Sequence, residues 1–254
     1  MSQTRSIGAF FDLDGTLLPA PSVERRFIFF LLMHGLFGPP QLVGSAARFI
    51  LSVARNSRAG SGSNKAHFRG VPVTCVQKWR EQFASRPLRL FSAGVRRLES
   101  HFAKGHRIFL ITGAPTPLAE LVARYLPVTA TIVGTRLGVR GGLWTGDIMG
   151  EHMNGAAKQR AIIRLAAAHD LNLSRSFAYG DSGSDIGMLE TVGYPAAVNP
   201  SKNLERLACA RNWSISRWRE TLSPRAGNSC DMGQSPPAFD ADFAGFTEFS
   251  GANQ

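Results

Sequence analysis

The sequence predicts an α/β fold in which a parallel sheet carries helices on both faces and a helical segment is inserted after the first strand. Short, continuous apolar runs are typical of strands that are buried on both faces. Amphipathic helical patterns alternate with these runs, and turn residues such as Gly113 and Pro115 end them. Strands that alternate with helices favour a mainly parallel sheet.

The predicted elements follow this alternation along the chain. The first buried strand is expected over residues 7–13, and the others over 107–112, 131–133, 176–179 and 196–198. Helices are expected over residues 116–125, 156–169, 185–192 and 201–212. Residues 136–148 predict a β-hairpin, because Gly141 and Gly142 separate two short segments.

One long segment interrupts the alternation and divides the chain. Residues 18–105 have helical character and are expected to form an inserted, basic helical cap, which leaves residues 1–17 and 106–222 as the α/β core. Within the insertion, residues 55–70 are rich in Gly, Ser and Arg and predict a mobile loop or linker. Residues 223–254 show little periodicity and are expected to be a disordered tail.

The length and composition exclude several classes of protein. With 254 residues, 44% of them hydrophobic and 19% charged, the chain can bury a substantial core and is neither a disulfide-stapled miniprotein nor collagenous. The three cysteines, Cys75, Cys209 and Cys230, lie far apart and form no CxxC pair. This pattern, together with a polar amino terminus, predicts a reduced, cytoplasmic protein without a signal peptide or a zinc cage.

The positive charge is concentrated in the insertion. Residues 18–105 contain 14 Lys or Arg and three Glu. The net charge of this segment is therefore +11, the same as the net charge of the whole chain. A positive surface attracts anions such as phosphorylated metabolites, acidic lipid headgroups or nucleic acid, although it also serves ordinary solubility. The seven apolar residues from Phe27 to Met33 are too few to span a bilayer. They are expected to form a buried helix, with an interfacial membrane anchor as the alternative.

Polar side chains gather where the predicted strands end. The carboxyl ends of parallel strands meet at one edge of the sheet, where ligands bind. Several carboxylates brought together there require a cation, and oxygen ligands favour Mg²⁺. The candidates come from five separate places in the chain: Asp12 and Asp14, Thr112 and Gly113, Lys158, Asp181, and Asp185.

These residue types suit the transfer of a phosphoryl group. Asp12 is expected to attack phosphorus and form an aspartyl-phosphate, and Asp14 to protonate the departing alcohol and later deprotonate water. Asp12, Asp14 and Asp181 are the expected ligands of Mg²⁺, and Asp185 is expected to orient a metal-bound water or Lys158. Thr112, the backbone near Gly113, and Lys158 are expected to bind the phosphate oxygens.

In this order the motifs resemble those of the haloacid-dehalogenase-like (HAD) phosphatases. The resemblance covers residues 7–213 and rests on four motifs: Phe11-Asp12-Leu13-Asp14-Gly15-Thr16, Ile111-Thr112-Gly113, Lys158, and Tyr179-Gly180-Asp181-Ser182-Gly183-Ser184-Asp185. Further similarity lies with the phosphoserine-phosphatase-like subfamily that carries a helical cap. The resemblance implies a Rossmann-like core, a cap that closes over the substrate, and a Mg²⁺-dependent phosphatase with Asp12 as nucleophile and Asp14 as acid and base.

The resemblance implies a small phosphate monoester as substrate but does not identify it. Phosphoserine phosphatases carry Ser in place of Gly15 and a cap glutamate at a spacing that Glu24 does not match. Two other functions stay open: a phosphatase at a membrane that acts on a phosphorylated lipid or its headgroup, and a non-catalytic protein that binds anions through the basic insertion. Nucleic acid is not the expected partner, and the sequence does not predict the oligomeric state.

Overall fold

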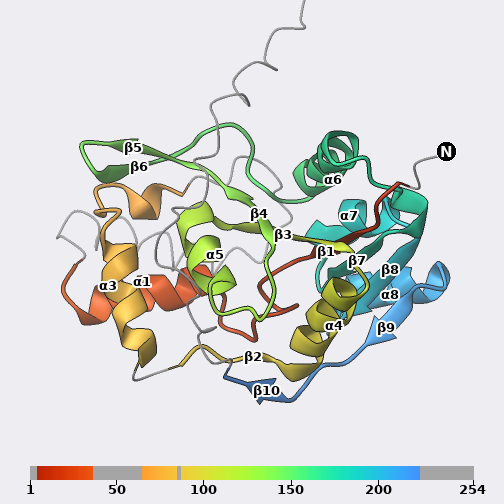
Figure 1. Ribbon diagram of the computed structural model, residues 1–254. Helices are drawn as coiled ribbons and strands as arrows, with labels where there is room; N and C mark the ends of the chain where they lie inside the picture. The colour runs from red at the N-terminus through yellow and green to blue at the C-terminus, as the bar shows by residue number, and fades with distance from the viewer. Residues whose placement is uncertain (1–4, 37–64, 85–86, 224–254) are drawn as a thin grey trace, which may run out of the picture.

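The computed structural model describes residues 5–36, 65–84 and 87–223. Its centre is a six-stranded sheet in the order β4-β3-β1-β7-β8-β9, in which every neighbouring pair is parallel (Figure 1). The strands are β1 (Gly8–Phe11), β3 (Arg107–Pro115), β4 (Thr131–Thr135), β7 (Phe177–Gly180), β8 (Tyr194–Val198) and β9 (Ser214–Ser216). The five strands predicted from apolar runs are therefore present, and β9 is an additional one.

The central strands are buried on both faces, as their continuous apolar sequences predict. In β1, Ala9 and Phe11 belong to one hydrophobic cluster and Phe10 to the other. The same alternation holds along β3, because successive side chains of a strand point to opposite faces. Alternate side chains along these strands therefore belong to two different core layers, one on each face of the sheet.

Helices cover both layers and complete the predicted α/β fold. The first cluster includes side chains from α4 and α5, and the second includes side chains from α6, α7 and α8. Figure 1 shows these helices flanking the sheet. Their bounds are α4 (Ser92–Ala103), α5 (Thr116–Ala123), α6 (Ala156–Ala168), α7 (Ile186–Glu190) and α8 (Lys202–Ala210), with the 3₁₀ turns η3 (Leu173–Arg175) and η4 (Gly183–Asp185).

The described part of the insertion is helical, as predicted. It contains α1 (Val23–Met33), η1 (Ala66–Phe68), α3 (Cys75–Glu81) and η2 (Gln82–Ala84). The Ser22 hydroxyl accepts a hydrogen bond from the Arg25 N–H and so caps α1. The apolar run of α1 is only partly buried: Phe27, Phe30 and Leu31 lie in the core, whereas Phe29, Leu32 and Met33 are exposed.

A hairpin from the second half of the chain completes the core of the insertion. β5 (Leu137–Arg140) and β6 (Leu143–Ile148) pair antiparallel, so the predicted hairpin is confirmed. Gly141 and Gly142, at its turn, have positive φ angles, which suit glycine. Trp144 in β6 is buried, and its ring packs against the rings of Phe27 and Phe68. The hairpin and the insertion therefore share one aromatic cluster.

The predicted mobile loop over residues 55–70 is wrong for its last six residues; residues 55–64 lie outside the described residues. Lys65 is 8% exposed and Phe68 is fully buried. The backbone of this segment also packs tightly on the hairpin, because a Cβ at Gly146 would lie 2.9 Å from the Cα of Ala66. Tertiary packing against Trp144 orders a stretch whose local composition predicts a loop.

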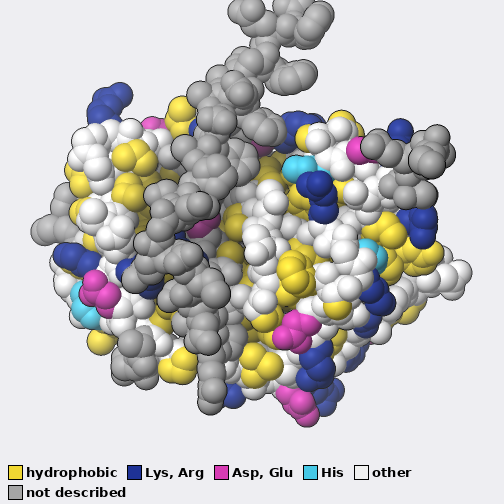
Figure 2. All heavy atoms as spheres, in the orientation of Figure 1, with side chains coloured by type: hydrophobic (Ala, Val, Ile, Leu, Met, Phe, Trp, Pro, Cys, Tyr) yellow, Lys and Arg dark blue, Asp and Glu magenta, His cyan; other side chains and the backbone are white. Residues whose placement is uncertain are grey.

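The carboxyl-terminal part of the 18–105 segment lies with the sheet. β2 (Leu90–Phe91) pairs antiparallel with β10 (Thr221–Leu222), and α4 packs against β3. We therefore propose that the insertion ends before β2, which shortens the predicted cap. Figure 2 shows Lys and Arg side chains over the α4 side of the molecule, where Arg96, Arg97 and Lys104 are exposed. Part of the predicted positive charge thus lies beside the core and not on the cap.

Three further expectations concern the surface and the tail. None of the helices in the described ranges combines the length and apolar character needed to cross a bilayer. Cys75 and Cys209 are free thiols, the first buried and the second exposed. Cys230 and the predicted disordered tail lie outside the described residues, apart from residue 223.

Candidate active site

Asp12 lies at the carboxyl end of β1, in the centre of the sheet. Its backbone N–H donates to the Tyr179 carbonyl of β7 at 2.9 Å, so the strand pairing holds the residue in place. The residue is 5% exposed. Burial raises the pKa of Asp12 well above its ordinary range; the charge of Lys158 opposes this shift, and that of Asp185 adds to it. A carboxylate here needs positive charge nearby to stay ionised.

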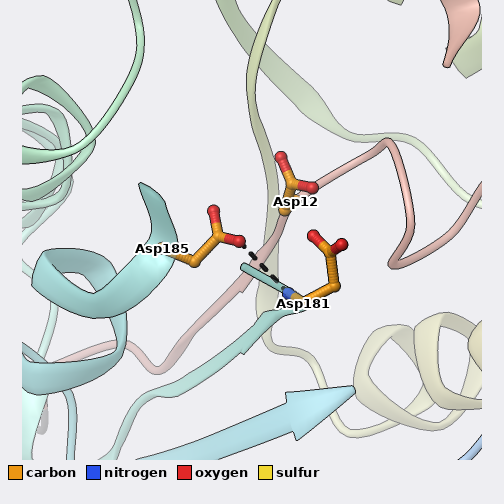
Figure 3. A group of neighbouring side chains, drawn as sticks. All are labelled: Asp12, Asp181 and Asp185. Atoms are coloured by element: carbon orange, nitrogen blue, oxygen red, sulfur yellow. Dashed lines mark hydrogen bonds between the residues drawn. The ribbon is translucent and has the colours of Figure 1, made fainter. Parts of the chain in front are cut away.

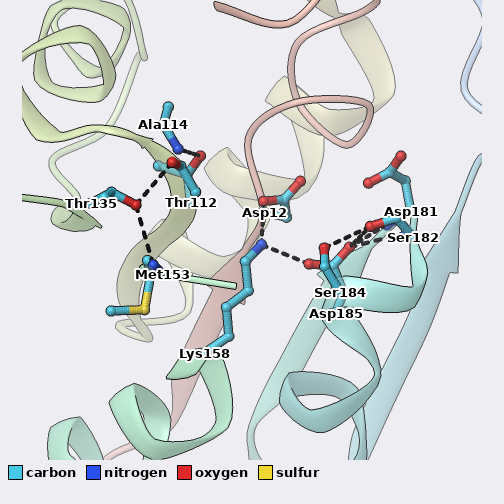
Figure 4. Close-up of polar contacts among 11 residues, drawn as sticks. Asp12, Thr112, Ala114, Thr135, Met153, Lys158, Asp181, Ser182, Ser184 and Asp185 are labelled. Atoms are coloured by element: carbon cyan, nitrogen blue, oxygen red, sulfur yellow. Dashed lines mark hydrogen bonds and ion pairs between the residues drawn. The ribbon is translucent and has the colours of Figure 1, made fainter. Parts of the chain in front are cut away.

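Lys158 supplies that charge from the first turn of α6. Its Nζ lies 2.5 Å from Asp12 Oδ1 and 2.6 Å from Asp185 Oδ1 (Figure 4). The residue is 2% exposed. Burial opposes its charge, but the two carboxylates outweigh this effect and hold the pKa of Lys158 above its ordinary range. The ammonium therefore stays protonated and bridges two carboxylates, that of Asp12 after β1 and that of Asp185 in η4.

Asp185 is buried behind Lys158 and organises the turn after β7. Its Oδ2 accepts hydrogen bonds from the N–H groups of Asp181 and Ser182 at 3.1 and 3.0 Å, and its Oδ1 accepts from Lys158. This close packing requires Gly180, because a Cβ there would lie 2.4 Å from the Asp185 Cβ. Asp185 thus orients both Lys158 and the backbone of Asp181, as the sequence predicts for Lys158.

Asp181 faces Asp12 across the site. Figure 3 shows the Asp12, Asp181 and Asp185 side chains close together, and one oxygen of each lies within 4.8 Å of the others. Burial, and then the charge of Asp185, raise the pKa of Asp181 to about 7. Its carboxylate lies against Gly15, where φ is +88°. Gly15 therefore allows both the positive φ angle of this turn and the close approach of the Asp181 carboxylate.

Asp14 lies two residues beyond Asp12 but belongs to a different set of contacts. Its Oδ1 accepts a hydrogen bond of 2.7 Å from the Val23 N–H at the start of α1. Burial raises the pKa of Asp14 to about 6, and the Val23 hydrogen bond opposes the shift. Asp14 is not in the carboxylate group of Figure 3. Its predicted role as a metal ligand stays a prediction.

Thr112 and Gly113 lie near the carboxyl end of β3, beside Asp12. Thr112 is 1% exposed, and its Oγ1 accepts a hydrogen bond of 3.2 Å from the Ala114 N–H. The Gly113 carbonyl accepts from Thr135 Oγ1 at 2.9 Å, and the same hydroxyl accepts from the Met153 N–H at 3.2 Å. These bonds hold the β3 end against β4 and the segment that leads to α6.

The predicted residues meet at one pocket of about 250 Å³. Asp12, Asp14, Thr112, Gly113, Lys158 and Asp181 line it, so residues separated by up to 169 positions in the sequence share one cavity. Asp185 lies behind Lys158 and completes the set. The carboxyl edge of the parallel sheet thus brings together every site residue that the sequence singles out.

The chemistry of the donor set suits a divalent cation. Three carboxylates, those of Asp12, Asp181 and Asp185, converge with one ammonium, that of Lys158. With all three carboxylates ionised, the group carries a net charge of −2, and burial, followed by this repulsion, raises the pKa values of Asp12 and Asp181. Carboxylate oxygens are the ligands that hard cations prefer, so the residues present fit such an ion.

Eight pocket residues carry no role in the sequence-based predictions. They are Glu24, Lys65, Ala114, His152, Met153, Asn154, Ser182 and Ser184. Ser182 and Ser184 lie between Asp181 and Asp185, so their position inside this motif could have indicated that they line the site. Lys65 lies in a Gly- and Ser-rich run that predicts a linker, and no local pattern marks it.

A comparison of the sequence with models of protein families assigns the chain to a family. Residues 9–190 match the family model described as haloacid dehalogenase-like hydrolase. The chain belongs to this hydrolase family. The matched segment contains all of the residues that the structure gathers around Asp12, so the resemblance predicted from the four motifs is confirmed.

Individual HAD relatives agree with this assignment. The chain is 32% identical over 219 residues to the phosphoserine phosphatase SerB1 of Mycobacterium tuberculosis. The matched region covers 83% of this chain and 70% of that protein. It is 35% identical over 219 residues to the Inhibition of morphological differentiation protein of Streptomyces azureus, covering 82% and 76%. A solved structure of a protein of unknown function from Bordetella pertussis Tohama I superposes with a TM-score of 0.70 at 28% identity, covering 84% and 99%.

Proposed function

We propose that this HAD hydrolase is a Mg²⁺-dependent phosphatase that cleaves a small phosphate monoester through an aspartyl-phosphate on Asp12. The observation that carries the proposal is the contact of 2.5 Å between Lys158 Nζ and Asp12 Oδ1, in a pocket that Thr112 and Asp181 also line. A buried, ionised carboxylate beside an ammonium can approach an anionic phosphate, because the ammonium offsets the repulsion.

In the first step, an oxygen of Asp12 attacks phosphorus while the bond from phosphorus to the alcohol oxygen breaks. Asp14 gives its proton to that departing oxygen. A pKa of about 6 suits this role, since the carboxyl can hold and release a proton near neutral pH. The Thr112 hydroxyl, the backbone near Gly113 and the Lys158 ammonium bind the phosphate oxygens that do not react.

In the second step, Asp14 takes a proton from water, and the water oxygen attacks phosphorus. The bond between phosphorus and Asp12 breaks, which restores the carboxylate and releases inorganic phosphate. We assign Asp12 and Asp181 as the main side-chain ligands of Mg²⁺, with the predicted contribution of Asp14 retained. The ion supplies positive charge that holds the carboxylates ionised and screens the phosphate.

The proposal is tested with para-nitrophenyl phosphate and Mg²⁺. We expect hydrolysis by the wild-type protein and loss of hydrolysis, to about background, for Asp12→Asn. Asp170→Asn is the matched control, because it makes the same substitution at an exposed carboxylate near the amino-terminal strand. Equal turnover by Asp12→Asn and the control would remove Asp12 as the nucleophile.

The intermediate is tested by acid quench after incubation with a ³²P-labelled substrate. We expect label on the wild-type protein but not on Asp12→Asn. Asp14→Asn is expected to accumulate more label than the wild type when the leaving group is para-nitrophenolate, which leaves without a proton, since only the second step then needs Asp14. Label that persists in Asp12→Asn contradicts the assignment.

One observation favours a second candidate, a phosphatase that works at a membrane surface. Phe29, Leu32 and Met33 are exposed in the carboxyl-terminal half of α1. Such a face suits an interfacial contact. Sedimentation of the full chain with anionic vesicles tests it: protein in the pellet supports an interfacial contact, and protein that stays in the supernatant contradicts it. We also propose a cytoplasmic location from the cysteine pattern, which is compatible with either outcome.

A further inference from the structure

Glu24, Lys65 and His67 form an ion-paired cluster in the described part of the insertion. Lys65 Nζ donates to Glu24 Oε2, and His67 Nε2 lies 2.8 Å from Glu24 Oε1. Burial disfavours the charge of Glu24, but the His67 hydrogen bond and the Lys65 charge outweigh it and lower the pKa of Glu24. Each oxygen of this ionised carboxylate therefore already has a nitrogen close to it, from Lys65 or from His67.

This cluster reaches the pocket at the end where Asp14 lies. Glu24 and Lys65 both line the cavity. Glu24 directly follows Val23, whose N–H is bonded to Asp14 Oδ1 at 2.7 Å. Under the proposed mechanism Asp14 protonates the departing alcohol. The cluster therefore lies where the carbon skeleton of the alcohol is expected to lie, and not around the phosphate.

The groups that the cluster still offers are donors. An ammonium has three N–H groups and no acceptor. Among the described residues, the acceptor that the structure gives Lys65 Nζ is Glu24 alone, and its side chain is 10% exposed toward the cavity. An ammonium on a substrate, by contrast, would have to compete with Lys65 and His67 for the Glu24 oxygens. A carboxylate on the substrate meets free N–H groups instead.

We propose that Lys65 and Glu24 select the leaving group, so that the preferred substrates are phosphorylated hydroxy acids, whose alcohol carries a carboxylate and no amine. This inference rests on the proposed phosphatase function and narrows its substrate class. Charge-assisted hydrogen bonds from Lys65 bind the carboxylate. Glu24 holds Lys65 in place and, being paired, gives no site to an ammonium. Lys65 and Glu24 are specificity residues in this scheme.

The test compares two small substrates, 2-phosphoglycolate and O-phosphoethanolamine. Both leaving alcohols have two carbons, and they differ in carrying a carboxylate or an ammonium. We expect the full-length wild-type protein to favour 2-phosphoglycolate in kcat/KM by about tenfold or more, the amount that one charge-assisted hydrogen bond provides. The ratio is measured within each variant, so that a general loss of activity cancels.

Two variants move this ratio in opposite directions. Lys65→Met removes the N–H donors and frees a Glu24 oxygen. The ratio of kcat/KM for 2-phosphoglycolate to kcat/KM for O-phosphoethanolamine is therefore expected to fall by about tenfold or more, to one or below. Glu24→Gln keeps an oxygen that can accept a hydrogen bond from Lys65 but removes the negative charge that repels a substrate carboxylate, so the ratio is expected to rise. Lys78→Met is the matched control, because it removes an exposed positive charge from α3, outside the pocket, and is expected to keep the wild-type ratio.

Failure of this inference differs from failure of the phosphatase proposal. If para-nitrophenyl phosphate is hydrolysed but the wild type does not favour 2-phosphoglycolate, the proposed selectivity is wrong. The same conclusion follows if Lys65→Met and Lys78→Met show the same ratio. If no phosphate monoester is hydrolysed at all, the phosphatase proposal fails and this inference falls with it.

Discussion

The Asp181 carboxylate occupies the space that a side chain at position 15 would fill: a Cβ on Gly15 would lie 2.3 Å from Asp181 Oδ2 and 2.6 Å from Asp181 Cγ. The backbone at Gly15 also has a φ of +88°, which L-residues rarely adopt. The first and fourth motifs are therefore adjacent in space, and the glycine of one makes room for the carboxylate of the other.

Gly15→Ala is expected to disable the site by displacing Asp181. A displacement of about 1 Å at a reacting site can cost about 100-fold in kcat, and we expect a loss of at least that order. Steady-state kinetics with para-nitrophenyl phosphate measure it. Gly142→Ala is the control, since Gly142 also has a positive φ but its Cβ would meet no atom within 4 Å. A similar loss in both variants would assign the effect to backbone strain and not to Asp181.

Asp181→Asn is expected to change stability in opposite senses with and without the cation. Without Mg²⁺, the substitution removes a carboxylate whose pKa is raised to about 7, so the free energy of unfolding at pH 8 should rise, by up to about 4 kcal/mol. With Mg²⁺, the wild type should gain more, because binding stabilises the folded state. Thermal unfolding at a series of Mg²⁺ concentrations follows both effects. A variant that gains as much from Mg²⁺ as the wild type contradicts the assignment of Asp181 as a ligand.

His101 is expected to make the protein less stable as the pH falls. It is 4% exposed, and its ring nitrogens lie 2.8 Å from Tyr179 Oη and 2.8 Å from His106 Nδ1. Burial, and then the neighbouring charges of His106, Arg97 and Lys104, lower the pKa of His101 to about 4. Between pH 6.5, the ordinary histidine value, and pH 4, the unfolded chain binds a proton that the folded chain does not.

The stabilisation from neutral His101 is therefore complete above pH 6.5 and is lost as the pH falls toward 4. From pH 7 to pH 5 we expect a loss of about 2 kcal/mol in the free energy of unfolding. Urea unfolding of the wild type and of His101→Gln at both pH values isolates this residue. If the two proteins lose stability in parallel over this interval, the burial of His101 is not the cause.

Trp144→Ala is expected to destabilise the insertion, because its ring packs against the rings of Phe27 and Phe68 at centroid distances of 5.9 and 5.2 Å. Truncation of a buried Trp costs about 3–5 kcal/mol. Leu143→Ala, at an exposed position next to it in β6, is the control. Chemical unfolding of both variants measures the difference, and equal stabilities would contradict a shared core between hairpin and insertion.

The sequence predicts the sheet well because its central strands carry a strong local signal. Phe10 and Phe109 are buried on one face, and Phe11 and Leu110 on the other, so continuous apolar runs mark these strands. Strand β9, by contrast, has the sequence Ser-Ile-Ser and gains its structure from pairing with β8. An edge strand of three residues, of which one is apolar, is too short for a sequence pattern to reveal.

The residues of the site likewise divide into those that a local sequence pattern predicts and those that it does not. Asp12 and Lys158 are predictable because motif spacing places them at strand and helix ends, and the structure brings them together. The contact between Asp14 and Val23, and the pairing of Lys65 with Glu24 across 41 positions, depend on how the insertion folds back onto the core. Such long-range tertiary contacts leave no local pattern in a single sequence.

The position of Trp144 has a consequence for engineering. Replacing the insertion by another one is a route to new selectivity. Here the graft would have to include β5 and β6, although residues 85–136 separate them from η2, the last helical turn of the described insertion. A donor insertion without its own hairpin would leave the host Trp144 facing an unmatched surface, so the unit of exchange is discontinuous in sequence.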